Sequence, residues 1–300
     1  MLSLLRKSCK QCTESSIKTY AVNIKALAKL AGLQEAPGSS GWINKALLEK
    51  VRKLPLHQYK RLSIAGVKAL NAYGKRSDDW HQAMTDSTKK YGARRDTQKR
   101  TPREAENWPK GGYSALRKLA HTLQEEVEPL FARKPTNVSR AQLYEMQRQF
   151  VILFYAHHAL RGDLGDVRIT KKGQNYIYKT GASWNVHVGQ HKTVRSRGAI
   201  DIRLDKPVSE ALSRLLPYVR ANTDHGFLLS TKRSGGKLSR KDMLIMLRTT
   251  TEERIGKRLG VQMIRVLKTT GALESIDKAV ELQRELGHGA GMQRRYVSRS

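Results

Sequence analysis

Five residues in the second half of the 300-residue chain have side chains that together suit phosphodiester chemistry: Arg161, Lys192, Arg265, His288 and Tyr296. A guanidinium bonds two phosphate oxygens at once and stays charged, so two of them on one phosphate would stabilise a pentacoordinate transition state. A tyrosine hydroxyl, with a pKa near 10, can attack phosphorus when cations or a base assist its ionisation. A lysine can protonate the departing 5′ oxygen. The set therefore suits DNA strand breakage through a covalent tyrosine link.

The local sequence around these residues indicates how they would be held. Arg161 ends an apolar helical run, and Asp163 beside it can orient the guanidinium. Lys192 lies in a predicted turn between two strands, and Arg265 lies in a predicted half-buried helix. Attack by Tyr296 would give a 3′-phosphotyrosyl link and a free 5′ hydroxyl. The link conserves the bond energy, so neither ATP nor a metal ion is required.

The order of these residues resembles the tyrosine recombinases, the phage-integrase family. That family's pattern is an arginine, a hairpin lysine, His-x-x-Arg, and a Leu-Gly-His segment shortly before the nucleophilic tyrosine. Residues 138–300 carry the pattern, and the matching residues are Arg161, Lys192, Arg265, His288 within Leu286-Gly287-His288, and Tyr296. The variants Leu160-Arg161-Gly162-Asp163-Leu164 and Asn175-Tyr176-Ile177 are most similar to recombinases of giant DNA viruses, virophages and related eukaryotic mobile elements.

The sequence departs from the family pattern at three places. Gln262 stands where the first histidine of His-x-x-Arg is usual; it can hydrogen-bond phosphate but cannot shuttle a proton. The acid that usually follows the first arginine by three residues has two candidates, Asp163 at two and Asp166 at five. Only four residues follow Tyr296, too few for the C-terminal helix that many relatives pass to a neighbouring subunit.

The resemblance implies a mainly α fold with a small antiparallel sheet, of the α+β class. It implies a helical DNA-clamping domain over residues 1–105, with a basic linker at its end, and a recombinase catalytic domain over 106–300. The expected activity is site-specific recombination or integration of a viral or mobile element, without a cofactor or metal. The expected partner is double-stranded DNA, bound by a homotetramer on paired sites. The expected location is wherever the target DNA lies, whether host nucleus, cytoplasm or viral factory.

Two alternatives stay open at this point. A topoisomerase of type IB shares the chemistry but relaxes supercoils as a monomer. A non-catalytic DNA-binding protein could keep the fold, and Gln262 is the feature that favours this interpretation.

The net charge of +31 independently indicates a polyanionic partner, of which nucleic acid is the first candidate. Residues 1–100 carry +14 and residues 101–300 carry +17, so both parts should face the polyanion. A basic protein of another kind, such as a ribosomal one, has the same composition.

The two cysteines, Cys9 and Cys12, exclude a disulfide scaffold and suit a reducing compartment, and no second pair completes a zinc site. No apolar stretch approaches the length of a membrane span.

Hydrophobic spacing predicts where the helices and strands lie. The N-terminal residues 1–7 are predicted to be a first helix, although a basic transit peptide would look similar. Ser15 or Ser16 is predicted to cap the next helix, and prolines at 102 and 109 predict a basic linker over 89–110. The predicted elements are helices within 15–76, at 112–131, at 138–160 and over most of 206–296, and strands at 165–170, 175–188 and 199–204.

Overall fold

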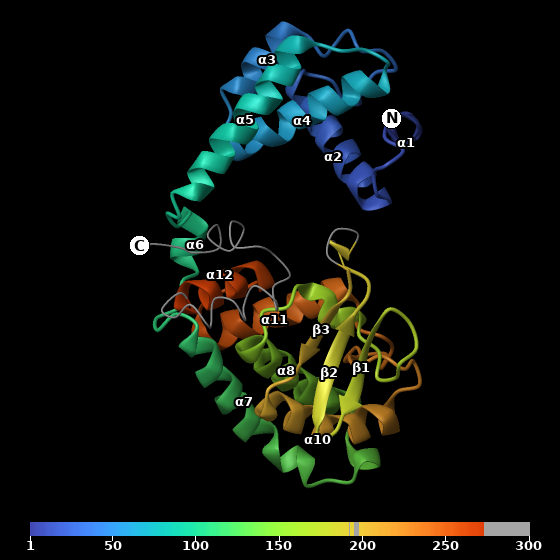
Figure 1. Ribbon diagram of the computed structural model, residues 1–300, viewed down its shortest axis with the longest axis vertical. Coiled ribbons are helices and arrows are strands. Elements are labelled where there is room, and N and C mark those ends of the chain that lie inside the picture. The colour runs from blue at the N-terminus through green and yellow to red at the C-terminus, as the bar shows by residue number, and fades with distance from the viewer. Residues whose placement is uncertain (192, 195–197, 273–300) are drawn as a thin grey trace. The chain divides into compact units, whose positions relative to one another are not determined.

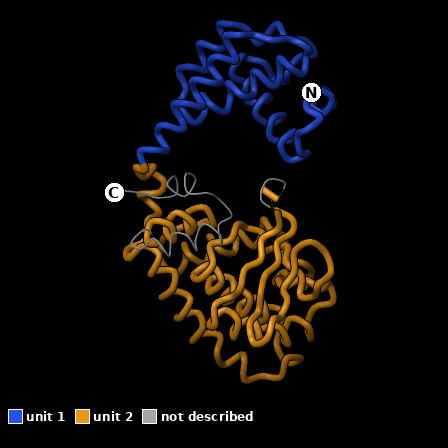
Figure 2. Tube along the Cα trace, in the orientation of Figure 1, with its two compact units in different colours: residues 1–97 blue, residues 98–300 orange. Residues whose placement is uncertain are grey.

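The computed structural model describes residues 1–191, 193–194 and 198–272. The chain divides into two compact units, Met1–Thr97 and Gln98–Ser300 (Figure 2). The first is helical, and the second combines helices with one three-stranded antiparallel sheet (Figure 1). The predicted class, mainly α with a small antiparallel sheet, is confirmed.

Unit 1 contains five helices whose apolar faces share one core. The helices are α1 (Leu2–Ser8), α2 (Glu14–Leu30), α3 (Lys45–Arg52), α4 (Leu56–Ala72) and α5 (Asp78–Asp96). The hydroxyl of Thr13 accepts a hydrogen bond from the Ser16 backbone amide, so Thr13 caps α2, and the prediction of Ser15 or Ser16 was wrong. The expected first helix over residues 1–7 is present as α1.

Helices α4 and α5 are in close contact at Gly66. A β-carbon added there would lie 2.2 Å from Cε3 of Trp80. Trp80 is almost completely buried and belongs to the core of this unit. The absence of a side chain at Gly66 is therefore what lets the indole lie against the backbone of α4.

We expect Gly66→Ala to destabilise unit 1, because the methyl group and the indole cannot both occupy that space. Overpacking of this kind costs about 1–3 kcal/mol of unfolding free energy. Urea unfolding would measure it, with Gly92→Ala as the matched control. Gly92 also lies in a helix but has open space around its α-carbon, so alanine there should stabilise by about 0.5–1 kcal/mol. Equal effects of the two substitutions would contradict the packing argument.

The basic segment that was expected to be a linker is partly helical. Residues 89–96 complete α5, so the linker prediction was wrong over that stretch. Pro102 does not prevent a helix, because it stands in the first turn of α6 (Pro102–Glu106), where a missing N–H costs nothing. Thr101 and Glu104 form a capping box at the same end.

The two cysteines differ from the expectation of reduced thiols. Cys9 follows the last residue of α1, and a disulfide joins it to Cys12 across one turn of chain. The bond ties the end of α1 to the segment that leads into α2.

The helices of unit 2 surround a second core, which draws residues from almost every element of the unit. After α6 come α7 (Ser114–Phe131), η1 (Pro135–Asn137), α8 (Arg140–His157) and η2 (Gly162–Asp166). The sheet follows, and then α10 (Lys206–Asn222), α11 (Arg240–Ile255) and α12 (Val261–Ala272). Helix α8 supplies the largest share of this core, because its residues from Phe150 to Ala156 are all buried.

The sheet has the order β1–β2–β3, with β1 (Asn175–Thr180), β2 (Ser183–Val188) and β3 (Ile200–Arg203). Ile177, Val186 and Ile202 lie opposite one another and are buried, so one sheet face belongs to the core. The predicted strand at 165–170 is wrong: residues 162–166 are the 3₁₀ helix η2, and Arg168 makes only isolated bridges. The predicted piece at 175–188 is a hairpin, because Gly181 adopts a positive φ between its two strands.

Within the described ranges, no helix is both long enough and apolar enough to cross a membrane.

Candidate functional site

Arg161 lies four residues beyond the end of α8, at the start of η2. The helix ends at His157 because His158 adopts an extended conformation, with φ −119° and ψ 121°. Arg161 caps η2, and its side chain is half-buried. The prediction that it ends the apolar helix was therefore close but wrong in detail: an irregular segment, not the helix itself, carries the guanidinium.

Arg265 lies on α12 and is only 1% exposed. The predicted half-buried helix is confirmed: seven of its twelve residues are buried, and Val261, Ile264 and Leu267 belong to the core of unit 2. Gln262, one turn earlier on the same helix, is exposed. A charged group as deeply buried as Arg265 costs several kcal/mol unless it is compensated by its surroundings.

The ends of α8 and α12 are tied together. The Lys268 ammonium donates a 2.6 Å hydrogen bond to the carbonyl of His157, the last residue of α8. Ala159 packs against Ala272 in the same region. A cation at a helix C-terminus also complements the helix dipole. These contacts bring the segment that carries Arg161 to the helix that carries Arg265.

Tyr155 lies at the centre of this arrangement. Its hydroxyl donates a 3.0 Å hydrogen bond to the carbonyl of Arg161. Burial raises the pKa of Tyr155 far above its usual value, Asp163 raises it further, and Arg240 and Arg265 oppose the rise. The side chain thus stays a neutral phenol that fixes the backbone at Arg161, with Asp163 and Arg265 close enough to affect its ionisation.

The two acids after Arg161 lie in different surroundings. Asp163 is 2% exposed, and the Nη1 of Arg240 lies 2.9 Å from its Oδ1, as an ion pair rather than an aligned hydrogen bond. Burial raises the pKa of Asp163, while the charges of Arg240 and Arg161 act to lower it. Asp166 instead pairs with Lys237 at 2.8 Å. Asp163 is therefore the buried acid of the two, and it lies close enough to Arg161 for the guanidinium to lower its pKa.

The chain after β2 also reaches this site. The Nη1 of Arg161 donates to the hydroxyl of Thr193 at 3.4 Å. The buried imidazole of His191 contacts the same hydroxyl. The described part of the site thus unites three segments that are far apart in the sequence.

Three of the predicted site residues, Lys192, His288 and Tyr296, lie outside the described residues. Two other residues, Thr193 and Arg240, contact the predicted ones but were not identified from the sequence, and His191 in turn contacts Thr193. For His191 and Thr193 a signal existed, since they flank Lys192. Arg240 had none, because nothing in its spacing relates it to Asp163.

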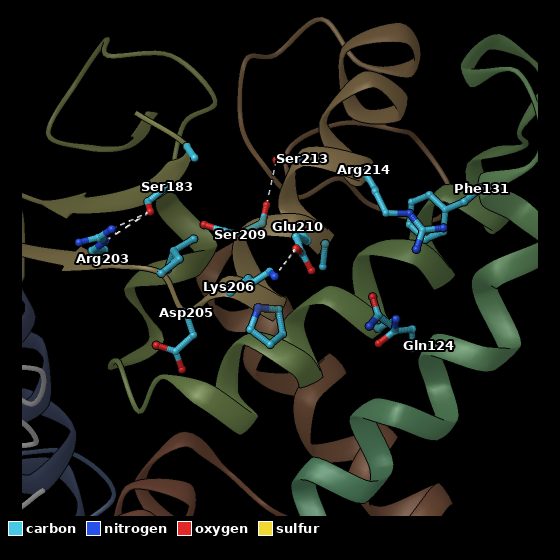
Figure 3. Close-up of a pocket in the computed structure, with 15 residues that line it drawn as sticks. Gln124, Phe131, Ser183, Arg203, Asp205, Lys206, Ser209, Glu210, Ser213 and Arg214 are labelled. Atoms are coloured by element: carbon cyan, nitrogen blue, oxygen red, sulfur yellow. Dashed lines mark hydrogen bonds and ion pairs between the residues drawn. The ribbon is translucent and has the colours of Figure 1, made fainter. Parts of the chain in front are cut away.

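No group of three or more metal-binding side chains is gathered within the described ranges. A cavity of about 950 Å³ lies elsewhere in unit 2, among α7, α8, the β1–β2 turn and α10. Figure 3 shows Arg214 lying against the Phe131 ring on one side and Arg203 bonded to Ser183 on the other. Neither Arg161 nor Arg265 lines this cavity, so the cavity and the arginine site are separate.

Two adjacent histidines, His157 and His158, hydrogen-bond to Asp205 and so hold the segment before Arg161. His157 Nδ1 lies 2.9 Å from the Asp205 carboxylate. His158 Nε2 accepts a 3.2 Å hydrogen bond from the Asp205 backbone amide. Burial lowers the pKa of His158 to about 4, despite the opposing charge of Asp205.

We expect His158 to make folding pH-dependent. Because the pKa is about 6.5 unfolded and about 4 folded, the unfolded chain binds a proton first as the pH falls. Stability from this residue is therefore complete above pH 6.5 and is lost towards pH 4, by about 3 kcal/mol. Urea unfolding from pH 7.5 to 4 would compare wild type with His158→Gln, whose amide oxygen accepts but does not titrate. A stability difference that stays constant across that range would contradict the expectation.

Comparison with known proteins gives structural likenesses but no match by sequence. No family model matches the sequence, and no curated protein matches it. Among solved structures the chain is similar to XerA recombinase, with 14% sequence identity and a TM-score of 0.45, over 100% of this chain and 93% of that chain.

Proposed function

We propose that this protein is a tyrosine-type DNA strand transferase, a site-specific recombinase or integrase of a viral or mobile element. The observation that carries the proposal is that Tyr155 bonds the backbone of Arg161 and lies close enough to Asp163 and Arg265 for their charges to affect it. Two arginines from distant segments, one of them fully buried, would form the kind of site that stabilises charge developing on a phosphate. The charge of +31 supports duplex DNA as the substrate.

In the proposed reaction the Tyr296 hydroxyl attacks the scissile phosphorus. The new bond joins the phenolic oxygen to phosphorus, the bond to the 5′ oxygen breaks, and the 3′ end stays attached to the protein. The phenolic proton leaves to a base, for which His288 is the candidate because Gln262 cannot accept it. Lys192 would protonate the departing 5′ oxygen. Rejoining reverses these steps with a 5′ hydroxyl from another strand.

The two parts of the chain would have different tasks. Residues 1–105 would clamp duplex DNA, and residues 106–300 would carry the chemistry. Strand exchange would require four copies of the chain on two paired sites. Unit 1 alone has a large positive charge in its sequence, which suits binding to the phosphate backbone without reading bases.

The experiment that tests the proposal is the trapping of a covalent protein–DNA adduct in the presence of EDTA. Nicked duplexes from the ends of the parent element would be incubated with the protein and separated under denaturing conditions. A stable adduct would support metal-free transesterification. Relaxation of any supercoiled plasmid without joining of two sites would indicate a topoisomerase instead. A clear band shift without any adduct would indicate a DNA-binding protein without this activity, as Gln262 favours.

A further inference from the structure

The turn after β2 contains a buried histidine with both ring nitrogens engaged. His191 Nε2 lies 2.9 Å from the carbonyl oxygen of Gly198. A carbonyl only accepts, so Nε2 carries the proton. Nδ1 faces the Thr193 backbone amide at 3.4 Å and the Thr193 hydroxyl at 3.2 Å. An amide only donates, so Nδ1 is an acceptor and the imidazole is the neutral Nε2–H tautomer.

Thr193 extends this arrangement to Arg161. Its hydroxyl oxygen accepts from Arg161 Nη1 at 3.4 Å, which leaves the hydroxyl proton for His191 Nδ1. The hydrogen bonds therefore run in one direction, from the guanidinium through the hydroxyl and the imidazole to the Gly198 carbonyl. Each donor in this series of hydrogen bonds meets an acceptor, and the amide and the hydroxyl of Thr193 share the Nδ1 of His191. Reversal of the His191 tautomer would set two donors against each other at Thr193.

The beginning of the same turn is anchored independently. The buried side chain of Asn175 accepts a 2.8 Å hydrogen bond from the Gln190 amide and donates to the Gln190 carbonyl at 3.3 Å. The Gly189 amide donates to the Gln174 carbonyl at 2.7 Å, and a β-carbon at Gly189 would lie 2.6 Å from that oxygen. The turn is thus attached to the start of β1 just before His191, and this attachment restricts the positions of His191 and Thr193.

We propose that Thr193 and His191 are positioning residues that aim the Arg161 guanidinium. The proposal rests on the proposed function, in which Arg161 binds the scissile phosphate. The Asp163 carboxylate attracts the guanidinium electrostatically, and the Thr193 hydroxyl accepts a hydrogen bond from it. Two such interactions from different segments restrict a long side chain that would otherwise sample many rotamers. A misplacement of about 1 Å at such a group can cost about 100-fold in rate.

Thr193→Val and Thr193→Ser form a matched pair for the test. Valine keeps the shape of threonine but removes the hydroxyl, whereas serine keeps the hydroxyl. At saturating protein we expect valine to slow single-turnover cleavage by about 10- to 100-fold, with the apparent DNA affinity changed less than about twofold. Serine should cleave at close to the wild-type rate. Wild-type rates for both variants, or a loss confined to DNA affinity, would overturn the proposal.

A double-mutant cycle separates positioning from a general structural effect. In an Arg161→Ala background, Thr193→Val should cause almost no further loss, because the group that it positions is gone. Losses that multiply independently would show that Thr193 acts by another route. His191→Gln should lower the rate in the same way, and His187→Gln serves as its control. His187 lies on β2 and pairs with Asp201 on the opposite face from the core residue Val186.

A measurement without DNA distinguishes failure of this proposal from failure of the proposed function. Nitrogen NMR of His191 should show a protonated Nε2 and an acceptor Nδ1, and Thr193→Val, but not Thr193→Ser, should shift the Nδ1 resonance. If wild type cleaves no DNA, the proposed function fails, while these spectra still decide whether the chain of hydrogen bonds exists. A proton on Nδ1 would overturn the positioning proposal even if the wild-type protein cleaves DNA normally.

Discussion

Tyr296→Phe should abolish the covalent protein–DNA adduct while leaving DNA affinity unchanged. The substitution removes one oxygen atom, the proposed nucleophile, and keeps the aromatic ring. Without that oxygen no phosphotyrosyl bond can form, so the expected loss is complete rather than partial. Denaturing gels with nicked duplex in EDTA would measure the adduct, and band shifts with the same DNA would measure the affinity.

A control for this experiment is a second tyrosine changed in the same way. Tyr176→Phe is suitable, because Tyr176 lies on β1 with its ring stacked on His187 at 4.7 Å between centroids, and removing its hydroxyl leaves that contact in place. This variant should form the adduct at the wild-type rate. An adduct that persists in Tyr296→Phe would show that another residue is the nucleophile, and the assignment of the whole set would then fail.

Arg161→Ala should slow cleavage by about 100- to 1000-fold, the effect of removing one preorganised donor to a developing charge. DNA affinity should fall far less, since the many other cations of the chain also bind phosphate. Single-turnover cleavage at saturating protein would measure the rate, and titration at fixed salt would measure the affinity. Equal losses in rate and affinity would reduce Arg161 to an ordinary phosphate contact.

Arg254→Ala is the matched control for that variant. Arg254 lies on α11 and makes a two-pronged ion pair with Glu126, so its loss removes an arginine of unit 2 without touching the proposed site. Its rate of cleavage should stay close to that of wild type.

Arg265→Ala is harder to interpret, because removing the fully buried side chain would leave a cavity and lower the stability of unit 2 as well as the rate of cleavage. The cleavage rate of Arg265→Ala must therefore be compared with that of wild type at a temperature well below the unfolding transition of the variant.

Part of the fold followed from local patterning. The helices α2, α3 and α4 were predicted because apolar residues recur on one face, and this periodicity reflects burial directly. All of α5 was missed, since the predicted helices of this part end at residue 76; residues 89–96 in particular are basic and mostly exposed, so the periodic signal is weak there. The false strand at 165–170 arose because Val167 and Ile169 alternate like a strand, although residue 168 alone makes bridges.

The sequence by itself determined the chemical proposal. The types and order of Arg161, Arg265 and Tyr296, together with the charge of +31, were readable without coordinates, because side-chain chemistry and net charge do not depend on folding.

Only the tertiary structure decided how Arg161 is held. It separated Asp163 from Asp166, since the two acids on one short helix have different partners, Arg240 and Lys237. It also brought His191 and Thr193 to the guanidinium. The physical reason is that these contacts join segments far apart along the chain, and their geometry is set by the packing of the helices and the sheet between them rather than by any local pattern.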